Sequence, residues 1–405
     1  MTPTPVSRAG ASSWKERRYG GRDHVLHGLP RQEDRRLHRP EVLALQRHRP
    51  RPRTVRRRGV GVSVLEGFAG PGGFSEGARI VGLPAGVGIE TNADACATAQ
   101  AAGHRRVRAD IRTLKPRLWF DVTGWVSGPP CPTYSGAGRR SGLDDYGTVL
   151  AAAERDDHDA YTRVTDPRSA LVLETLRLAL ELPGVEWIVA EQVPAVHAIW
   201  EEFAAELAID YWSSCDVITL RADDFGMPTR RTRVFLIAHR FDPPDLSGLP
   251  VRTWWSCGRN RPPTYIAPPV AARIPAPSMA GALGWPDGVR INTRGQRRTA
   301  GGNEFAADAP APSITGRARS WYRTDTGQRL QPWQAGLLQG FPPGYPWHGS
   351  RSSRFQQAAD AVPPPMAAAV LATVTGRRWR TAITAHLHDL YGPAPGQLDL
   401  FEGVA

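Results

Sequence analysis

The chain has 405 residues, 41% of them hydrophobic, so it is long enough to bury a sizeable core and to form two folded domains. Its net charge of +12 is concentrated at one end, because residues 1–58 contain 16 Lys and Arg against 5 Asp and Glu and so contribute 11 of these charges. No apolar run has the length of a membrane span, and no apolar stretch follows the N-terminal charges. We therefore expect neither a membrane protein nor a secretory signal.

Residues 1–60 are rich in Arg, His and Pro and lack apolar periodicity, which predicts a disordered basic arm. Such charge favours nucleic acid through phosphate contacts, but a solvated tail without a partner is equally typical of it. Four widely spaced cysteines with no CxxC pair argue against a disulfide framework or a zinc site. We expect a cytoplasmic protein with no metal site.

From residue 61 onward, short apolar runs alternate with helical periodicity. The pattern predicts strands at residues 62–65, 85–90, 125–127, 187–190, 211–220 and 233–238. It predicts helices at residues 74–81, 93–102, 169–182 and 196–207, and a polar, charged stretch at 139–166. Strands that alternate with helices indicate an α/β fold with a mostly parallel, Rossmann-like sheet and helices on both faces.

The amino-acid composition changes after residue 241, and residues 241–312 are rich in Pro, Gly, Arg and Trp. This composition predicts a small, irregular second domain. Helical pattern returns at residues 333–338 and 365–375, and the last of these helices is expected to rejoin the first domain. The expected boundaries are 1–60 for the arm, 61–240 for the main domain, 241–312 for the second domain and 313–405 for the returning part.

A glycine-rich turn, Phe68-Ala69-Gly70-Pro71-Gly72-Gly73, lies between the first strand and the first helix. Glycines allow a tight turn and a close approach to a ligand at a helix N-terminus. Glu90 ends the second strand, where an acid accepts hydrogen bonds from a ribose. Asp110-Ile111 follows a further short strand that is expected after the helix at 93–102. A nucleotide-like cofactor is one interpretation of this set, and a plain turn with two surface carboxylates is the other.

Further reactive side chains follow later strands. Cys131 comes after Pro129-Pro130 at the end of one strand, and Glu191 directly follows another. Carboxyl ends of parallel strands are where open α/β sheets bind ligands. Arg231 and Arg233 alternate onto one face of the strand near residue 235, where they could hold an anion or a polarised carbonyl. A lone Cys is more often a small buried hydrophobe.

In this order the motifs resemble the cytosine-5 DNA methyltransferase family. The resemblance rests on FAGPGGF, IETNADA, RADI, GPPC, EQVPAV, TRRTRVFLIA, PSIT, LQGFP and QAADAVPP and covers about residues 61–375. It implies S-adenosyl-L-methionine as cofactor, double-stranded DNA as partner and a target-recognition domain at 241–312. It also allows a cognate restriction endonuclease that acts independently, and we expect a monomer.

The resemblance also implies roles for single residues. Catalysis would use Cys131, Glu191, Arg231 and Arg233. Cofactor binding would use Phe68, Gly70, Gly72, Gly73, Glu90, Asp110, Ile111, Pro130 and Asp360. Base or phosphate contacts in the recognition domain would come from Arg252, Trp254, Trp255, Arg259 and Arg261, although the two Trp residues could equally form a small core.

The chain departs from the family pattern at four places beside these residues. Pro132 stands where the family has Gln, Gln192 where it has Asn, Thr229 where it has Gln, and Ala359-Asp360 where it has Gly-Asn. Two alternatives therefore stay open: an RNA cytosine-5 methyltransferase of the same fold, and a catalytically degenerate DNA-binding member. A nicotinamide oxidoreductase would share the glycine-rich turn but gives the Pro-Pro-Cys and Arg-x-Arg segments no role.

Overall fold

The computed structural model describes residues 63–84, 86–130, 145–155, 162–255, 264–293 and 304–392, all within a compact unit that begins at Arg58. At its centre is a seven-stranded sheet of order β3-β2-β1-β4-β5-β8-β6. Its strands are β1 (Ser63–Gly67), β2 (Val87–Glu90), β3 (Arg105–Arg108), β4 (Val122–Ser127), β5 (Trp187–Gln192), β6 (Ser214–Arg221) and β8 (Thr232–His239). Only β8 runs antiparallel to its neighbours among these strands, so the predicted mostly parallel α/β sheet is confirmed.

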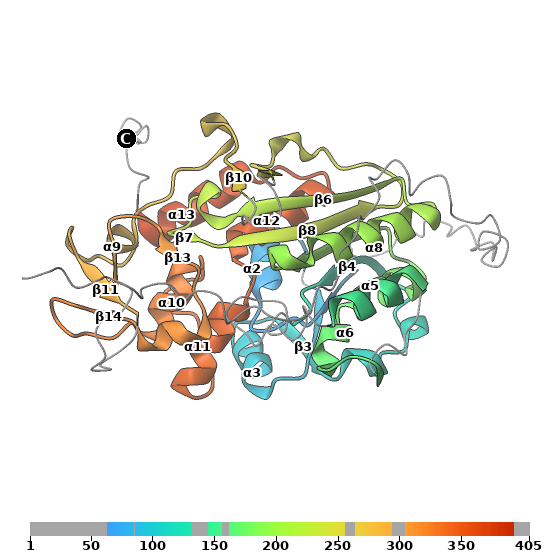
Figure 1. Cartoon of the computed structure of the whole chain (residues 1–405), viewed down its shortest axis with the longest axis horizontal. Helices are drawn as coiled ribbons and strands as arrows, with labels where there is room; N and C mark the ends of the chain where they lie inside the picture. The colour runs from blue at the N-terminus through green and yellow to red at the C-terminus, as the bar shows by residue number, and fades with distance from the viewer. Residues whose placement is uncertain are drawn as a thin grey trace, which may run out of the picture. The chain divides into compact units, whose positions relative to one another are not determined.

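Helices cover both faces of this sheet (Figure 1). One face packs against α5 (Tyr146–Arg155), α7 (Leu173–Glu181) and α8 (His197–Ile209), with Trp125 and Trp200 fully buried between the layers. The other face packs against α2 (Gly73–Ile80), α12 (Pro364–Val374) and α13 (Arg380–Tyr391). Every residue of α12 is buried, which explains its apolar composition all around the helix. As expected, α12 returns to the main domain and lies against α2.

The sequence-based prediction was wrong for two helical regions of the main domain. The helix expected at 169–182 is split into α6 (Pro167–Ala170) and α7, with α6 starting at the N-cap Asp166. Helix α5 lies inside the stretch that was predicted to be merely polar. Its buried residues Val149, Ala152 and Ala153 recur at helical spacing, but the many charges around them hid the stripe. The short helix α3 (Ala93–Ala101) agrees with the prediction.

The described parts of residues 241–312 contain only short elements. Besides two 3-10 helices, these are β9 (Thr253–Trp255), β10 (Thr264–Ile266), α9 (Met279–Ala282), β11 (Arg290–Asn292), β12 (Glu304–Ala306) and β13 (Ala311–Pro312). They are followed by β14 (Tyr322–Arg323), α10 (Pro332–Leu338) and α11 (Arg351–Asp360). Strand β11 pairs with both β12 and β14, and one hydrophobic core joins Met279 and Ile291 to Phe341 and Phe355. That core therefore extends across the expected boundary at residue 312.

Arg252 is a clear departure from expectation. Its side chain is 4% exposed and donates two hydrogen bonds to Asp224, from Nε to Oδ2 at 2.6 Å and from Nη2 to Oδ1 at 2.8 Å. A buried guanidinium held by both oxygens of a carboxylate cannot reach a base or a phosphate. The prediction that Arg252 contacts DNA is wrong, because sequence composition does not show that an arginine has a buried partner.

No helix in the described parts of the chain is long and apolar enough to cross a membrane.

We predict that Arg252→Ala destabilises the fold by about 3–5 kcal/mol, because it leaves Asp224 buried without its counter-charge. Burial already raises the pKa of the Asp224 carboxyl, against the opposing effect of Arg252. The variant should therefore hold a proton on Asp224, and its stability deficit should shrink as the pH falls. Urea unfolding at several pH values measures this.

The matched control is Arg290→Ala, which removes an exposed ion pair with Glu304 at 3.4 Å. Such pairs contribute about 0–1 kcal/mol, so the control should unfold nearly as the parent does. If Arg252→Ala were as mild as this control, the buried pair would not hold the fold and Arg252 would again be a candidate for DNA contact.

Candidate active site

The predicted site residues gather at one edge of the sheet. β1, β2, β4 and β5 are parallel, so their carboxyl ends meet there with the turns that follow them. β8 runs the opposite way, so it brings its start rather than its end to this edge. Arg233 therefore lies beside Glu191, although the two residues belong to strands of opposite direction.

The glycine-rich turn after β1 has an unusual backbone. Phe68 has a φ of 55°, Gly70 of 52° and Gly72 of 115°, and the turn ends as α2 begins at Gly73. A left-handed φ at a bulky residue such as Phe68 costs on the order of 1 kcal/mol or more and is typical of functional sites. The amide of Ala69 donates to the Ile89 carbonyl at 3.0 Å, which fixes the turn to β2. The turn is thus held in one shape beside the end of β2.

The glycines of this turn serve different purposes. A Cβ on Gly72 would lie 2.8 Å from the Tyr345 hydroxyl, and one on Gly73 would lie 2.2 Å from the Val362 carbonyl oxygen. Both glycines therefore allow the C-terminal part of the chain to pack closely on the turn. A Cβ on Gly70 would meet nothing nearer than 4.0 Å. Gly70 is thus the position of the turn with open space, where a ligand could approach the backbone.

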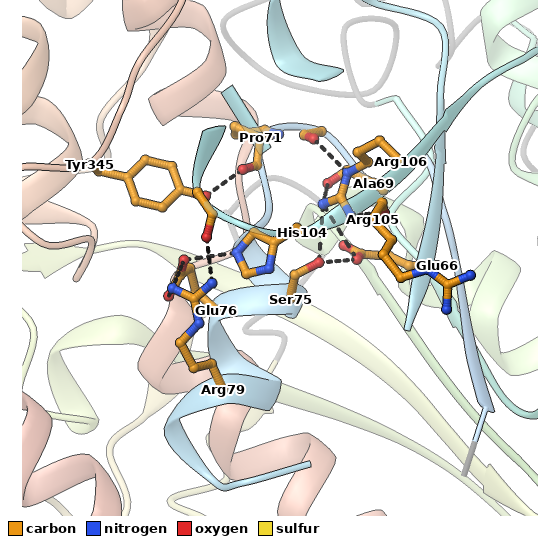
Figure 2. Close-up of polar contacts among 12 residues, drawn as sticks. Glu66, Ala69, Pro71, Ser75, Glu76, Arg79, His104, Arg105, Arg106 and Tyr345 are labelled. Carbon is orange, nitrogen blue, oxygen red and sulfur yellow. Dashed lines mark hydrogen bonds and ion pairs between the residues drawn. The ribbon is translucent and has the colours of Figure 1, made fainter. Parts of the chain in front are cut away.

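A buried polar network holds the turn from below (Figure 2). Arg106 of β3 donates from Nη2 to the Ala69 carbonyl at 3.3 Å and to Ser75 Oγ at 3.1 Å. Ser75 in turn donates to Glu66 Oε2 at 2.7 Å. Glu66 lies 3.7 Å from the guanidinium, and burial nevertheless raises the pKa of its carboxyl. The buried charges of Arg106 and Glu66 thus fix the position of the glycine-rich turn from inside the protein.

The second half of the network joins the turn to the C-terminal region (Figure 2). Tyr345 donates its hydroxyl proton to the Pro71 carbonyl at 2.6 Å, and burial raises the pKa of this phenol. His104 Nε2 lies 2.8 Å from Glu76 Oε1, which also accepts from Arg79 at 2.9 Å. Sequence reasoning missed the contacts of Tyr345 and His104, because their partners lie 274 and 28 residues away and follow no periodic pattern.

The two acids predicted to bind a cofactor differ in their surroundings. Glu90 accepts from the Gly70 amide at 2.8 Å on one oxygen and from the Asn92 amide at 2.7 Å on the other, so it lies against the turn. Asp110 is paired with Arg112 through both oxygens, and this hydrogen bonding lowers the pKa of its carboxyl. Glu90 is the acid that the structure brings to the glycine-rich turn.

Three other cofactor candidates lie at different depths. Ile111 is buried in the core and lies beneath Gly67, so its side chain contributes packing. Pro130 is half-buried at the end of the described part of its loop, beyond β4. Asp360 ends α11, and burial of its carboxyl raises the pKa of this group against the opposing effects of Gln356, Arg231 and Arg233.

Cys131 lies outside the described residues, as do Pro132, Arg259 and Arg261, and the side chains of Trp254 and Trp255 are likewise outside the description. The segment just before Cys131 is held by Gln192, whose amide donates from Nε2 to the Pro129 carbonyl at 2.9 Å. Gln192 is 2% exposed and also accepts from the Val193 amide. The Gln that replaces the family's Asn is thus part of the frame of this loop.

Glu191 and Arg233 form a nearly buried ion pair, with Glu191 Oε1 2.5 Å from Arg233 Nε. This oxygen is thus already in contact with a guanidinium nitrogen, although the contact lacks hydrogen-bond geometry. The pair places a carboxylate and a guanidinium side by side at the edge of the sheet, where a ligand could meet both.

Arg231 occupies a different environment from Arg233. It lies 3.5 Å from the Ile314 carbonyl through Nη1 and 3.5 Å from the Asp360 carbonyl through Nη2. Thr229 pairs in β7 (Thr229–Arg230) with Ala311 of β13, so the same segment is bound to the C-terminal part twice. The two arginines have different contacts: Arg233 faces Glu191, whereas Arg231 joins the strand to the later part of the chain.

The side chains at the turn suit a nucleoside cofactor. Glu90 supplies carboxylate oxygens next to the open space at Gly70, and Phe68 supplies a partly buried ring. Acceptors of this kind match the ribose hydroxyls of such a ligand. Within the described ranges, no three His, Cys, Asp or Glu side chains gather in a way that could hold a metal ion.

Comparison with known proteins finds relatives of this chain. The family model of C-5 cytosine-specific DNA methylase matches residues 62–155. Type II methyltransferase M.AplI of Arthrospira platensis is 25% identical over 83% of the chain and 92% of the relative, and M.NgoMIV of Neisseria gonorrhoeae is 25% identical over 76% and 95%.

The fold agrees as well. The methyltransferase EhMeth of Entamoeba histolytica has a TM-score of 0.52 at 14% identity, over 78% of this chain and 99% of that one. A Spodoptera frugiperda DNMT2 variant has a TM-score of 0.50, also at 14% identity, over 77% and 99%. The family model of C-5 cytosine-specific DNA methylase thus matches the segment that contains the glycine-rich turn, and most of the chain is similar to Type II methyltransferases.

Proposed function

We propose that the protein transfers a methyl group from S-adenosyl-L-methionine to carbon 5 of a cytosine flipped out of duplex DNA. The observation that carries this is the nearly buried Glu191–Arg233 pair, a carboxylate and a guanidinium held together at the same edge of the sheet as the glycine-rich turn. Glu191 lies one residue from Gln192, which binds the Pro129 carbonyl just before Cys131. The hydrogen bond of Gln192 thereby connects the proposed base-binding acid, Glu191, to the segment that leads to the candidate nucleophile.

Carbon 5 of cytosine is a weak nucleophile, and a thiolate solves this problem by adding to carbon 6. In the proposed reaction Cys131 forms a bond from sulfur to carbon 6, and Glu191 shares a proton with ring N3 to offset the charge that develops there. Arg233 holds Glu191 and favours anionic character nearby. When bound, S-adenosyl-L-methionine would supply the methyl group to carbon 5 and leave as S-adenosylhomocysteine. Transfer of the carbon 5 proton to water would then expel the Cys131 thiolate and restore the ring.

Cofactor binding is proposed for the glycine-rich turn and its acids. Gly70 gives room at the backbone and Glu90 would accept from the ribose hydroxyls, while Asp110 and Ile111 would flank the adenine. Asp360 would lie on the far side, near Arg231 and Arg233. A base buried in a duplex must leave the stack to reach this edge. A monomeric state and a restriction endonuclease with the same target stay predictions.

The direct test is methylcytosine sequencing of DNA from a host that expresses the protein, beside methyl transfer from labelled cofactor to duplex DNA and to tRNA. Transfer to duplex DNA at one sequence supports the proposal. Transfer to tRNA alone would favour the RNA methyltransferase, and DNA binding without any transfer would favour the degenerate member.

We predict that Cys131→Ala and Cys131→Ser abolish methyl transfer, since serine has no comparable anion fraction at neutral pH. Cofactor and DNA affinity should stay near those of the parent. Duplex DNA with 5-fluorocytosine should trap the parent as a covalent adduct, because fluorine cannot leave as the proton does; gel shift under denaturing conditions detects it. Cys96→Ala is the control, because the Cys96 thiol is buried against the Glu90 carbonyl. An adduct that persists in Cys131→Ala would exclude Cys131 as the nucleophile.

Glu191→Gln keeps the shape of the side chain but removes its proton exchange with the base. We expect kcat to fall on the order of 100-fold, the usual effect of losing one preorganised transition-state contact, with the methylated sequence unchanged. Glu186→Gln is the matched control, because Glu186 directly precedes the opposite end of β5. Single-turnover rates at saturating DNA measure the effect. Equal rates for the two variants would remove Glu191 from the chemistry.

Asp360 provides a charge test of cofactor binding. The sulfonium makes S-adenosylmethionine one unit more positive than S-adenosylhomocysteine, so a carboxylate here should favour the former. Because the pKa of Asp360 is raised, the parent should bind S-adenosylmethionine more tightly as the pH rises through this titration. Asp360→Asn should lose that rise and bind the two ligands more equally, as calorimetry can show. A variant with the parent's pH profile would place Asp360 away from the cofactor.

A further inference from the structure

Five arginines gather on the C-terminal part of the chain. Arg317 and Arg319 lie in the 3-10 helix η9 (Gly316–Ser320), Arg329 precedes α10, and Arg351 and Arg354 lie in the first turn of α11. We call these residues the basic cluster. All except the half-buried Arg351 are exposed.

Arg351 holds the basic cluster together. Its Nη2 donates to the Arg319 carbonyl at 3.2 Å and to the Leu330 carbonyl at 2.7 Å, and its guanidinium lies over the Phe355 ring at 4.8 Å. Helix η9 packs along α11, so the arginines of both elements stay on one part of the surface. Fixed geometry of this kind distinguishes the cluster from scattered surface charge.

Among the residues that the structure describes, no carboxylate neutralises the basic cluster. Within the described residues none of its members forms an ion pair, whereas the neighbouring Arg290 and Arg323 pair with Glu304 and Asp325. Asp94 reaches α11 but accepts from Ser353 instead. Burial and the charge of Arg329 both lower the pKa of Arg351. Like charges held together without a counter-ion favour binding of an anion.

A series of contacts leads from the basic cluster to the catalytic edge. Gly316 lies against Gln356, where a Cβ would come within 2.1 Å of Oε1. Gln356 donates to Asp360 Oδ1 at 2.7 Å, and the Asp360 carbonyl lies near Arg231. Along α11, the nine steps from Arg351 to Asp360 span roughly 14 Å at about 1.5 Å per residue. One DNA strand carries a phosphate about every 3.4 Å of helix axis, so this length corresponds to a few nucleotides.

We propose that the basic cluster binds the phosphate backbone of the DNA duplex a few nucleotides from the target cytosine. The inference rests on the proposed function as a DNA methyltransferase. It places a nucleic-acid contact outside residues 241–312, where recognition was expected. Arginines on phosphates position a duplex and carry no base preference, so the basic cluster would orient DNA while other residues select the sequence.

The test compares the Arg317→Gln/Arg319→Gln double variant with Arg290→Gln/Arg323→Gln, whose arginines are already paired with carboxylates. Anisotropy of a fluorescein-labelled duplex of random sequence gives Kd across a series of salt concentrations. Losing two phosphate contacts should lower the slope of log K against log salt by about 2. The control should keep the parent's slope, and Arg354→Gln should lower it by about 1. Cofactor affinity and the urea midpoint should stay unchanged in all variants.

An unchanged slope in the double variant would overturn the proposal and make the basic cluster a solvated face. An affinity loss limited to the methylated sequence, with random duplex bound as before, would also overturn it, because that result indicates base contacts. A parent that methylates DNA while the double variant shows no slope change would leave the proposed function intact. A parent that binds no duplex at all would overturn both.

Discussion

The direction of a single strand determines what the catalytic edge can contain. Five strands of the sheet run parallel from β3 to β5, and their carboxyl ends supply the glycine-rich turn, Glu90 and Glu191. β8 inserts antiparallel between β5 and β6, so its first residues, not its last, come to that edge. Arg233 thereby reaches Glu191 within 2.5 Å. In an all-parallel sheet the same arginine would lie at the opposite edge, and Glu191 would be a buried carboxylate without a counter-charge.

Much of the charge buried in the sheet has no direct part in the proposed chemistry. Arg106, Glu66, His104 and Glu76 lie beneath the glycine-rich turn and bond its carbonyls or each other. Burying such groups is unfavourable unless each has partners, so the network is sensitive to the loss of any member. Its contribution is the position of the turn, since a left-handed Phe68 persists only where its surroundings hold it.

Sequence pattern was informative where function depends on local order. The strand-turn-helix around Gly70 and the acid at the end of β2 could be predicted because period, glycine content and position along a strand are local properties. The mostly parallel sheet followed from the alternation of elements. Helix α5 was missed because charges masked its buried stripe, and the use of Arg252 was misjudged because its partner Asp224 lies 28 residues away. Likewise, nothing in the Arg231–Arg233 spacing indicated that the two side chains contact different groups. An arginine looks the same in sequence whether it pairs with a buried acid or faces solvent.

The hydrogen bond from Tyr345 to the Pro71 carbonyl joins residues 274 positions apart, and Val362 closes on Gly73 over a similar span. During synthesis the N-terminal turn therefore leaves the ribosome long before its supports exist. Contacts of such sequence separation form late and slow the folding of a domain. A nascent chain that stops before α12 lacks the partner of α2, since Gly77 packs directly on Ala367. Truncated products should be unable to hold the turn in place, so the activity of this protein would emerge as a single late step in its biogenesis, with no partly active fragments beforehand.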